Sequence, residues 1–266
     1  MTAAGARVAA FGVLLVAVFG LAALAGRAID PVADPDAPAA APAHGSAPEA
    51  HGDERLRLAA GDTTLPPGRP ARLDFAVIDE RGARVREFEV EQGRRMHLIV
   101  VRRDLRRFQH LHPTEVAPGA WRTTITLPDA GVYQAFADFQ TGGTRRTLGV
   151  DLFAAGDFEP LALPAPSTAA VTDGYHVALR ERDGELRFAV SRDGEPVEDL
   201  QPYLGARGHL VMLRAGDLAY EHVHPVEGGD LAFDAAGAAA GTYRLFLQFR
   251  HRDALRTAAF TREVAP

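Results

Sequence analysis

The sequence of 266 residues predicts an all-β protein with two tandem β-sandwich domains, which follow an N-terminal transmembrane helix and a disordered linker. Three observations support this prediction. The second half of the chain repeats segments of the first half in the same order. Short alternating or apolar runs recur about every ten residues between turn signals, as in sandwich proteins. No long segment after residue 53 shows a helical period.

The first segment, residues 1–27, is typical of a membrane signal. Nineteen uncharged residues, 8–26, lie between Arg7 and Arg27. As a helix they extend about 28 Å, close to the hydrocarbon core of about 30 Å. This length favours an uncleaved single-pass anchor at the cell membrane, and a cleaved signal peptide with secretion is the alternative. Both interpretations place the bulk of the chain outside the cytoplasm.

Residues 28–53 form the predicted linker. Its stretch 31–53 contains five prolines and eight alanines among 23 residues. This composition buries too little apolar area to fold, so we expect a semi-extended disordered tether.

Composition excludes several kinds of chemistry. The chain has no cysteine, and all 29 of its basic residues are arginine. Disulfides, thiolate metal sites, a thiol nucleophile and a lysine Schiff base are therefore excluded. The net charge of −6 argues against nucleic acid as the main partner.

An internal repeat organises the remainder. Residues 97–113 (HLIVVRRDLRRFQHLHP) and 209–225 (HLVMLRAGDLAYEHVHP) are identical at six of 17 positions without a gap. A second match follows, GVYQAFADFQ at 131–140 against GTYRLFLQFR at 241–250. The order is the same in both halves, so the sequence indicates duplication of one domain.

The two predicted domains span residues 54–165 and 166–266. In the first, strands are expected near 55–59, 72–79, 84–90, 96–102, 107–112, 121–127, 131–140 and 145–153. In the second, they are expected near 174–180, 185–191, 207–214, 218–223, 231–234, 241–250 and 255–263. Seven or eight short strands in about 100 residues are typical of an immunoglobulin-like or cupredoxin-like sandwich.

Six of the ten histidines fall in two copies of one pattern, His-x12-His-x-His-Pro. The members are His97, His110 and His112 in the first copy and His209, His222 and His224 in the second. A hairpin closed by a two-residue loop places His97 opposite His110, and His209 opposite His222. Opposed residues share a face, as do residues i and i+2, so each triad is expected on one face. A longer loop changes this register.

Three imidazoles on one face suit Cu(II) or Zn(II), which bind nitrogen at about 2 Å. We predict a metal site at these six histidines, with copper favoured because it binds such ligands more tightly and zinc as the alternative. Whether each copy holds an ion or the copies share one stays open. A hydrogen-bonded structural network is the other interpretation of the histidines. Met96 and Met212 lie near the first histidine of each copy but do not align, so we expect core packing.

Other repeated residues have structural interpretations. Tyr133 and Tyr243 resemble the tyrosine that pins the corner of a sandwich. Arg102 and Arg214 recur beside the hairpin turn and are expected to pair with nearby carboxylates. Asp138 and Glu221 are possible extra ligands or bases, but neither acid is repeated in the other copy, so we expect solvated strand positions.

The segments MHLIVVRRDLRRFQHLHP, YLGARGHLVMLRAGDLAYEHVHP and GTYRLFLQF resemble a bacterial family of membrane-anchored or secreted proteins associated with heavy-metal-binding domains and metal efflux. The resemblance covers roughly residues 55–266. It implies a cupredoxin-like or immunoglobulin-like sandwich and a link to copper or another heavy metal. The chain departs from these associations in lacking cysteine, so electron transfer of the blue-copper type is not expected.

Three functional hypotheses follow. The favoured one is a non-enzymatic, membrane-tethered, extracytoplasmic protein that buffers copper or zinc or hands it to a metal-transport partner. The second is a surface interaction module of tandem sandwiches whose histidines are core residues. The third is a metalloenzyme with three histidine ligands and an open coordination position. No repeated acid supplies a base for the third, and no catalytic residue is predicted.

Overall fold

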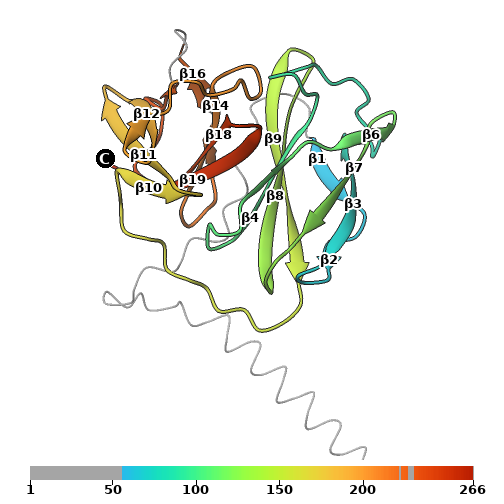
Figure 1. The fold of residues 1–266 in the computed structure, drawn as a ribbon. Helices are drawn as coiled ribbons and strands as arrows, with labels where there is room; N and C mark the ends of the chain where they lie inside the picture. The colour runs from blue at the N-terminus through green and yellow to red at the C-terminus, as the bar shows by residue number, and fades with distance from the viewer. Residues whose placement is uncertain (1–55, 222, 227–230, 266) are drawn as a thin grey trace, which may run out of the picture. The chain divides into compact units, whose positions relative to one another are not determined.

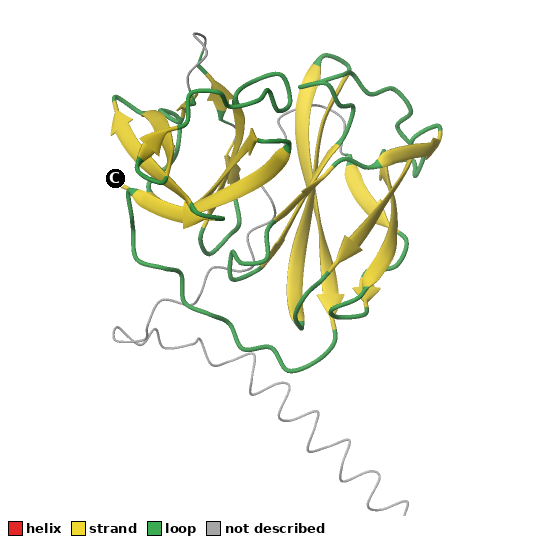
Figure 2. Ribbon diagram, in the orientation of Figure 1, coloured by secondary structure: helices red, strands yellow, loops and turns green. Residues whose placement is uncertain are grey.

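The computed structural model describes residues 56–221, 223–226 and 231–265 (Figure 1). Within these ranges all regular secondary structure is β (Figure 2). This part of the chain contains no helix that is long and apolar enough to cross a membrane. The predicted anchor, residues 1–27, and the predicted linker, residues 28–53, lie outside the described residues.

The first repeat contains two sheets. One has the order β1 (Arg57–Ala60), β3 (Pro70–Ile78), β7 (Ala120–Thr126), β6 (Thr114–Ala117). The other has the order β2 (Thr64–Leu65), β9 (Thr144–Ala154), β8 (Gly131–Thr141), β4 (His97–Arg102), β5 (Gln109–Leu111). Apolar side chains from both sheets pack between them and form one core: Leu58, Leu73, Phe75, Val77, Leu98, Val100, Trp121, Tyr133, Phe139 and Leu152 among others.

The second repeat also contains two sheets. One has the order β10 (Ala169–Thr172), β11 (Tyr175–Arg182), β12 (Glu185–Arg192), β17 (Ala232–Asp234), β16 (His224–Pro225), and β13 (Glu195–Pro196) pairs with β12. The other has the order β15 (Tyr220–Glu221), β14 (Gly208–Arg214), β18 (Gly241–His251), β19 (Ala254–Val264). Its core contains Tyr175, Leu186, Phe188, Leu210, Met212, Phe233, Leu245 and Phe249 among others.

The two repeats share one topology. The order β1-β3-β7-β6 corresponds to β11-β12-β17-β16, and β5-β4-β8-β9 corresponds to β15-β14-β18-β19. Each repeat has a core between two sheets, so the prediction of tandem β-sandwich domains is confirmed at this level. Assignment to an immunoglobulin-like or a cupredoxin-like type stays a prediction.

One predicted strand is wrong. Residues 84–90 form isolated bridges instead, in which Arg84 pairs with Ile78 and Glu89 pairs with Gln140. Ile78 lies in one sheet and Gln140 in the other, so this segment crosses between the sheets of the sandwich. A crossing segment cannot pair along its length with either sheet, although its residues alternate as in a strand.

Strands β4 and β14 are buried on both faces. Leu98 and Val100 of β4 belong to the core of their own repeat, whereas Ile99 and Val101 belong to a third apolar cluster. This inter-repeat cluster consists of Ile99, Val101, Leu105, Phe136, Val211, Leu213, Leu218 and Phe246. Because side chains alternate along a strand, one face of β4 contacts its own core and the other contacts the second repeat. Both repeats belong to one compact unit of the chain.

The contacts between the repeats are reciprocal. Phe108 of the first repeat stacks on Phe246 of the second, with ring centroids 4.2 Å apart. Tyr220 of the second repeat packs on Phe136 of the first, with centroids 5.8 Å apart. Phe108 aligns with Tyr220 and Phe136 with Phe246, so equivalent residues make equivalent contacts in both directions. This is the pattern of an interface with approximate two-fold symmetry.

Candidate metal centre

The hairpin of β4 and β5 brings three histidines of the first repeat to one face. Its register pairs His110 with Ile99, so the predicted pairing of His110 with His97 is wrong. The connection is longer than the expected two-residue loop, and Leu105 within it adopts a positive φ of 58°. The observed register differs from the predicted one by two positions, and an even difference leaves each side chain on the same face of the strand. His97, His110 and His112 therefore still share a face.

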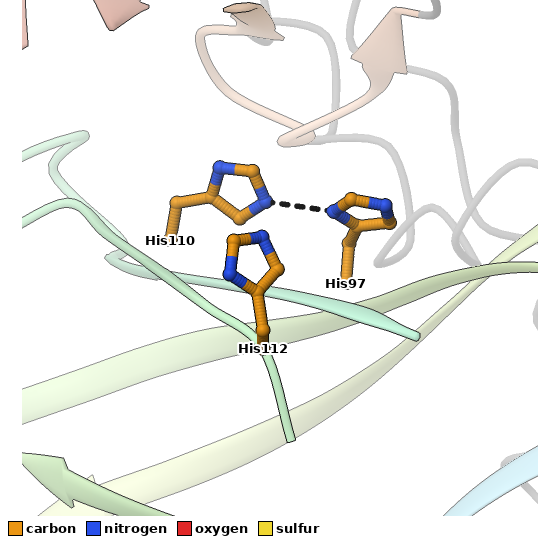
Figure 3. Close-up of side chains that lie close together, drawn as sticks. All are labelled: His97, His110 and His112. Carbon is orange, nitrogen blue, oxygen red and sulfur yellow. Dashed lines mark hydrogen bonds between the residues drawn. The ribbon is translucent and has the colours of Figure 1, made fainter. Parts of the chain in front are cut away.

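The three rings form a tight group (Figure 3). One nitrogen from each lies within 4.8 Å of the other two. Ring centroids are 5.3 Å apart for His97 and His110, 5.2 Å for His97 and His112, and 4.8 Å for His110 and His112. Imidazoles that bind one ion tetrahedrally at about 2.0–2.1 Å have centroids about 5 Å apart. The group is spaced as such ligands are, and its role as a ligand set stays a prediction.

Hydrogen bonds to oxygen assign the protons of two rings. His97 Nε2 lies 3.2 Å from the backbone oxygen of Glu91, and His110 Nδ1 lies 2.7 Å from Gln248 Oε1. These oxygens only accept, so with the Gln248 amide in this orientation both nitrogens carry hydrogen. The remaining nitrogens, Nδ1 of His97 and Nε2 of His110, are 3.1 Å apart, and the dashed line in Figure 3 marks this contact. With the protons assigned in this way, each of the two nitrogens presents a lone pair to the other. Two facing lone pairs repel, and a cation bound by both removes that repulsion.

Burial keeps these rings neutral. It lowers the pKa of His97. It also lowers the pKa of His110 to about 3, although the hydrogen bond to Gln248 opposes this shift. Burial, together with the nearby His97, lowers the pKa of His112 to about 4. Near pH 7 the rings are therefore in the neutral form that binds metal ions, and a proton does not bridge the facing lone pairs.

Two further residues lie near the cluster, Asp138, whose role the sequence left open, and Gln248, to which it gave no role. Asp138 is 2% exposed and its carboxylate contacts Arg145 at 2.9 Å, so the expected solvated position is wrong. It lies opposite His97 on β8, as Gln248 lies opposite His209 on β18. The repeat alignment contains this signal, because Asp138 and Gln248 occupy equivalent positions after the two first histidines.

The predicted residues of the second repeat lie apart from one another. His209 is on β14, whereas His224 is exposed on β16, which belongs to the other sheet. His222 lies outside the described residues. The β14–β15 register pairs Met212 with Glu221, which again differs by two positions from the predicted register that pairs His209 with His222. The roles of these three histidines as ligands stay predictions.

His209 lies beside the cluster of the first repeat. Its ring centroid is 4.6 Å from that of His110 and 6.2 Å from that of His97. The side chain is buried, and burial lowers the pKa of His209 well below the usual value. Its Nδ1 is buried without a hydrogen-bond partner, as is Nε2 of His112. The structure therefore brings together four of the six predicted histidines, from both repeats.

Both methionines near the histidines point the other way. Met96 is buried in the core of the first repeat and Met212 in the core of the second. Each precedes or follows the histidine by an odd number of positions, so it faces the opposite side of the strand. The prediction that they pack in the cores is confirmed.

Comparisons with solved structures found only remote likenesses. An Escherichia coli adhesin, FdeC, is 13% identical, with 79% of this chain and 64% of that chain covered and a TM-score of 0.27. A Salmonella alpha-2-macroglobulin mutant is 14% identical, with 82% and 15% covered and a TM-score of 0.28. Domains 5–6 of the S-layer protein SbsC are 10% identical, with 80% and 99% covered and a TM-score of 0.25. At TM-scores below 0.5, these likenesses carry no argument about activity.

The chain covers less than two thirds of the length of the adhesin and of the alpha-2-macroglobulin. No curated protein matches the sequence. One protein-family model, described as a domain of unknown function (DUF8832), matches twice, at residues 50–156 and at residues 169–266. The two matches fall on the two repeats and together cover most of the sequence. The chain therefore belongs to the DUF8832 family and contains two copies of its domain.

Proposed function

We propose that this protein binds a metal ion without acting as an enzyme, and that His97, His110 and His112 are ligands. The observation that carries the proposal is the pair of lone pairs that His97 Nδ1 and His110 Nε2 direct at each other across 3.1 Å. Each ring is fixed in this tautomer by an oxygen on its far side, which is how proteins orient metal-binding histidines. The rings are also neutral near pH 7, so no proton must leave before an ion binds.

The donor set favours Cu(II), with Zn(II) as the alternative. Imidazole nitrogen suits both ions, and copper binds such ligands more tightly than zinc does. Cu(I) prefers sulfur, but the thioethers of Met96 and Met212 lie in the cores on the opposite faces of their strands.

The proposed location of the protein at the membrane rests on its N-terminal sequence. An anchor at residues 8–26 and a tether at 28–53 hold the two repeats outside the cytoplasm at the membrane surface. A tethered site keeps the ion at high effective concentration near a membrane partner. The function that fits is buffering of copper or zinc, or its transfer to a metal-transport protein.

Metal titration of the full chain tests the proposal. Cu(II) and Zn(II) are added to the wild-type protein, to the variant His110→Ala/His112→Ala, and to His176→Ala as a control on the exposed side of β11. Bound metal is counted after dialysis, and thermal unfolding is followed. Wild type and control are expected to retain an ion and to melt at higher temperature with it, because a ligand of the native state stabilises that state.

The variant His110→Ala/His112→Ala is expected to retain no ion and to melt at the same temperature with and without metal. If wild type retains no metal and the double variant only melts earlier, the histidines are a structural network. The proposal is then wrong, and the surface interaction module becomes the better hypothesis.

A further inference from the structure

We infer that the two repeats share one metal ion, and that His209 of the second repeat supplies a fourth ligand to the cluster of the first. This inference rests on the proposed function, because it names a further ligand of the same site. The ion then joins the two repeats.

The position of His209 follows from the duplication. His97 and His209 are equivalent residues on the equivalent strands β4 and β14. Two residues further along, Ile99 and Val211 both lie in the inter-repeat cluster. Because residues i and i+2 share a face, both histidines lie on the face that each strand turns toward the other repeat. The symmetry of the interface therefore brings the two together.

The nitrogens of His209 and His112 give a second, independent argument. Nδ1 of His209 and Nε2 of His112 are buried and have no hydrogen-bond partner. Such groups are rare in native proteins because each loses its bonds to water on burial. In the tautomers that leave Nδ1 of His209 and Nε2 of His112 without hydrogen, these two nitrogens and the facing lone pairs of His97 and His110 make four acceptors in one place that lack a donor. A single cation satisfies all four.

His209 reaches an ion bound by the other three histidines only if its ring turns, and we expect it to do so when the ion binds. Its nitrogens are not among the three that lie within 4.8 Å of one another. Its ring centroid is nevertheless 4.6 Å from that of His110, slightly closer than the 4.8 Å between His110 and His112, although it is 6.2 Å from that of His97. Rotation about the terminal torsion of histidine has a broad, shallow profile, so the ring turns without moving β14.

The second repeat already orients one ligand of the first. Gln248 of β18 accepts from Nδ1 of His110 at 2.7 Å, and its amide nitrogen donates to Thr257 at 3.5 Å. On the backbone Gln248 lies directly opposite His209. The strand pair β14–β18 of the second repeat therefore positions both the proposed ligand His209 and Gln248, the hydrogen-bond partner that orients His110.

X-ray absorption spectroscopy on the copper-loaded full chain counts the imidazole ligands directly. Four are expected in wild type and in the control His176→Gln, and three in His209→Gln. Loss of a partner outside the ligand shell weakens metal binding about 10–100-fold, so we expect His209→Gln to lose at least about tenfold in copper affinity. Circular dichroism of the metal-free variant checks that it is folded.

The outcomes separate the two proposals. If wild type binds copper with three imidazoles, and His209→Gln binds it equally well, His209 is no ligand and the inference is wrong while the proposed function stands. If wild type binds no copper, both are wrong. A count of three in wild type contradicts the inference even if His209→Gln fails to fold, and a count of four that persists in His209→Gln contradicts it as well.

Discussion

The imidazoles of His97 and His209 stack across the two repeats, with ring centroids 6.2 Å apart and ring planes within 5° of parallel. They are the same residue of the duplicated domain, but their surroundings differ. His97 has His110 and His112 beside it on the neighbouring strand, whereas His224 lies in a different sheet from His209. The duplicated pattern has therefore produced one histidine cluster, to which each repeat contributes, among the residues that the structure describes.

Removing the amide of Gln248 is expected to weaken metal binding without unfolding the protein. In Gln248→Leu the Nδ1–H of His110 loses its acceptor, so the ring is no longer held with Nε2 toward the ion. Copper affinity measured by isothermal titration calorimetry should fall about 10–100-fold. Gln201→Leu, which breaks a hydrogen bond to Asp253 elsewhere, is the control and should bind normally. Equal affinity of both variants would contradict the assigned tautomer.

The metal-free protein should lose stability below pH 6.5. Burial lowers the pKa of His110 to about 3 and that of His112 to about 4, whereas both are near 6.5 when unfolded. Between these values the unfolded chain binds protons that the folded chain does not, so acid favours unfolding. Stability is complete above pH 6.5 and falls by up to about 1.4 kcal/mol per pH unit for each histidine.

Urea unfolding in the presence of a chelator, from pH 7.5 to pH 5, measures this slope. His110→Gln/His112→Gln should show a flatter dependence on pH. An unchanged slope would mean that other groups cause it.

The two equivalent arginines should differ in the cost of losing their partners. Arg102 contacts Asp104 at 2.9 Å and 2.6 Å, and the two side chains are only 6% and 4% exposed. Arg214 makes the equivalent pair with Asp217, but these side chains are 30% and 40% exposed. The expected pairing with carboxylates is thus confirmed in both repeats.

Asp104→Ala leaves a buried guanidinium without its main partner and should cost about 3–5 kcal/mol of unfolding free energy. Asp217→Ala should cost about 0–1 kcal/mol. Chemical denaturation compares the two, and equal costs would contradict the argument from burial.

The corner tyrosines should contribute equally to both repeats. The hydroxyl of Tyr133 donates to the backbone oxygen of Asp129 at 2.9 Å, and that of Tyr243 donates to the oxygen of Ala239 at 2.8 Å. Both span four residues, as the sequence predicted for a sandwich corner. Tyr133→Phe and Tyr243→Phe should each reduce the unfolding free energy by about 1 kcal/mol, because each backbone carbonyl loses its donor. A change below 0.3 kcal/mol, taken as roughly the error of the measurement, would show that water replaces the hydroxyl.

The fold was predictable because it depends on local patterns. Alternation and turn residues mark most strands, and the duplication shows that the two halves share a topology. The register of β4 and β5 was not predictable, because the loop contains Leu105 at positive φ, a conformation that leucine rarely adopts. The histidines were nevertheless predicted on the correct face. The observed register differs from the predicted one by two positions, and an even difference leaves each side chain on the same face.

The approach of His209 to the first repeat was not predicted. The runs LIVV in β4 and LVML in β14 are apolar throughout, which indicates strands buried on both faces. Such a run does not predict which part of the protein packs on the second face. In this structure the other repeat packs there, and this packing, rather than any hairpin, brings His209 to His110.

The reciprocal contacts of Phe108 with Phe246 and of Tyr220 with Phe136 have an evolutionary consequence. A single ancestral domain carries both halves of this contact, so its surface is complementary to itself. Two separate copies of such a domain would be able to pair through the same faces, which would place their first histidines at the axis. Joining the two copies in one chain would make that pairing permanent and leave each half free to change on its own. The different positions of His112 and His224 are what such independent change would produce.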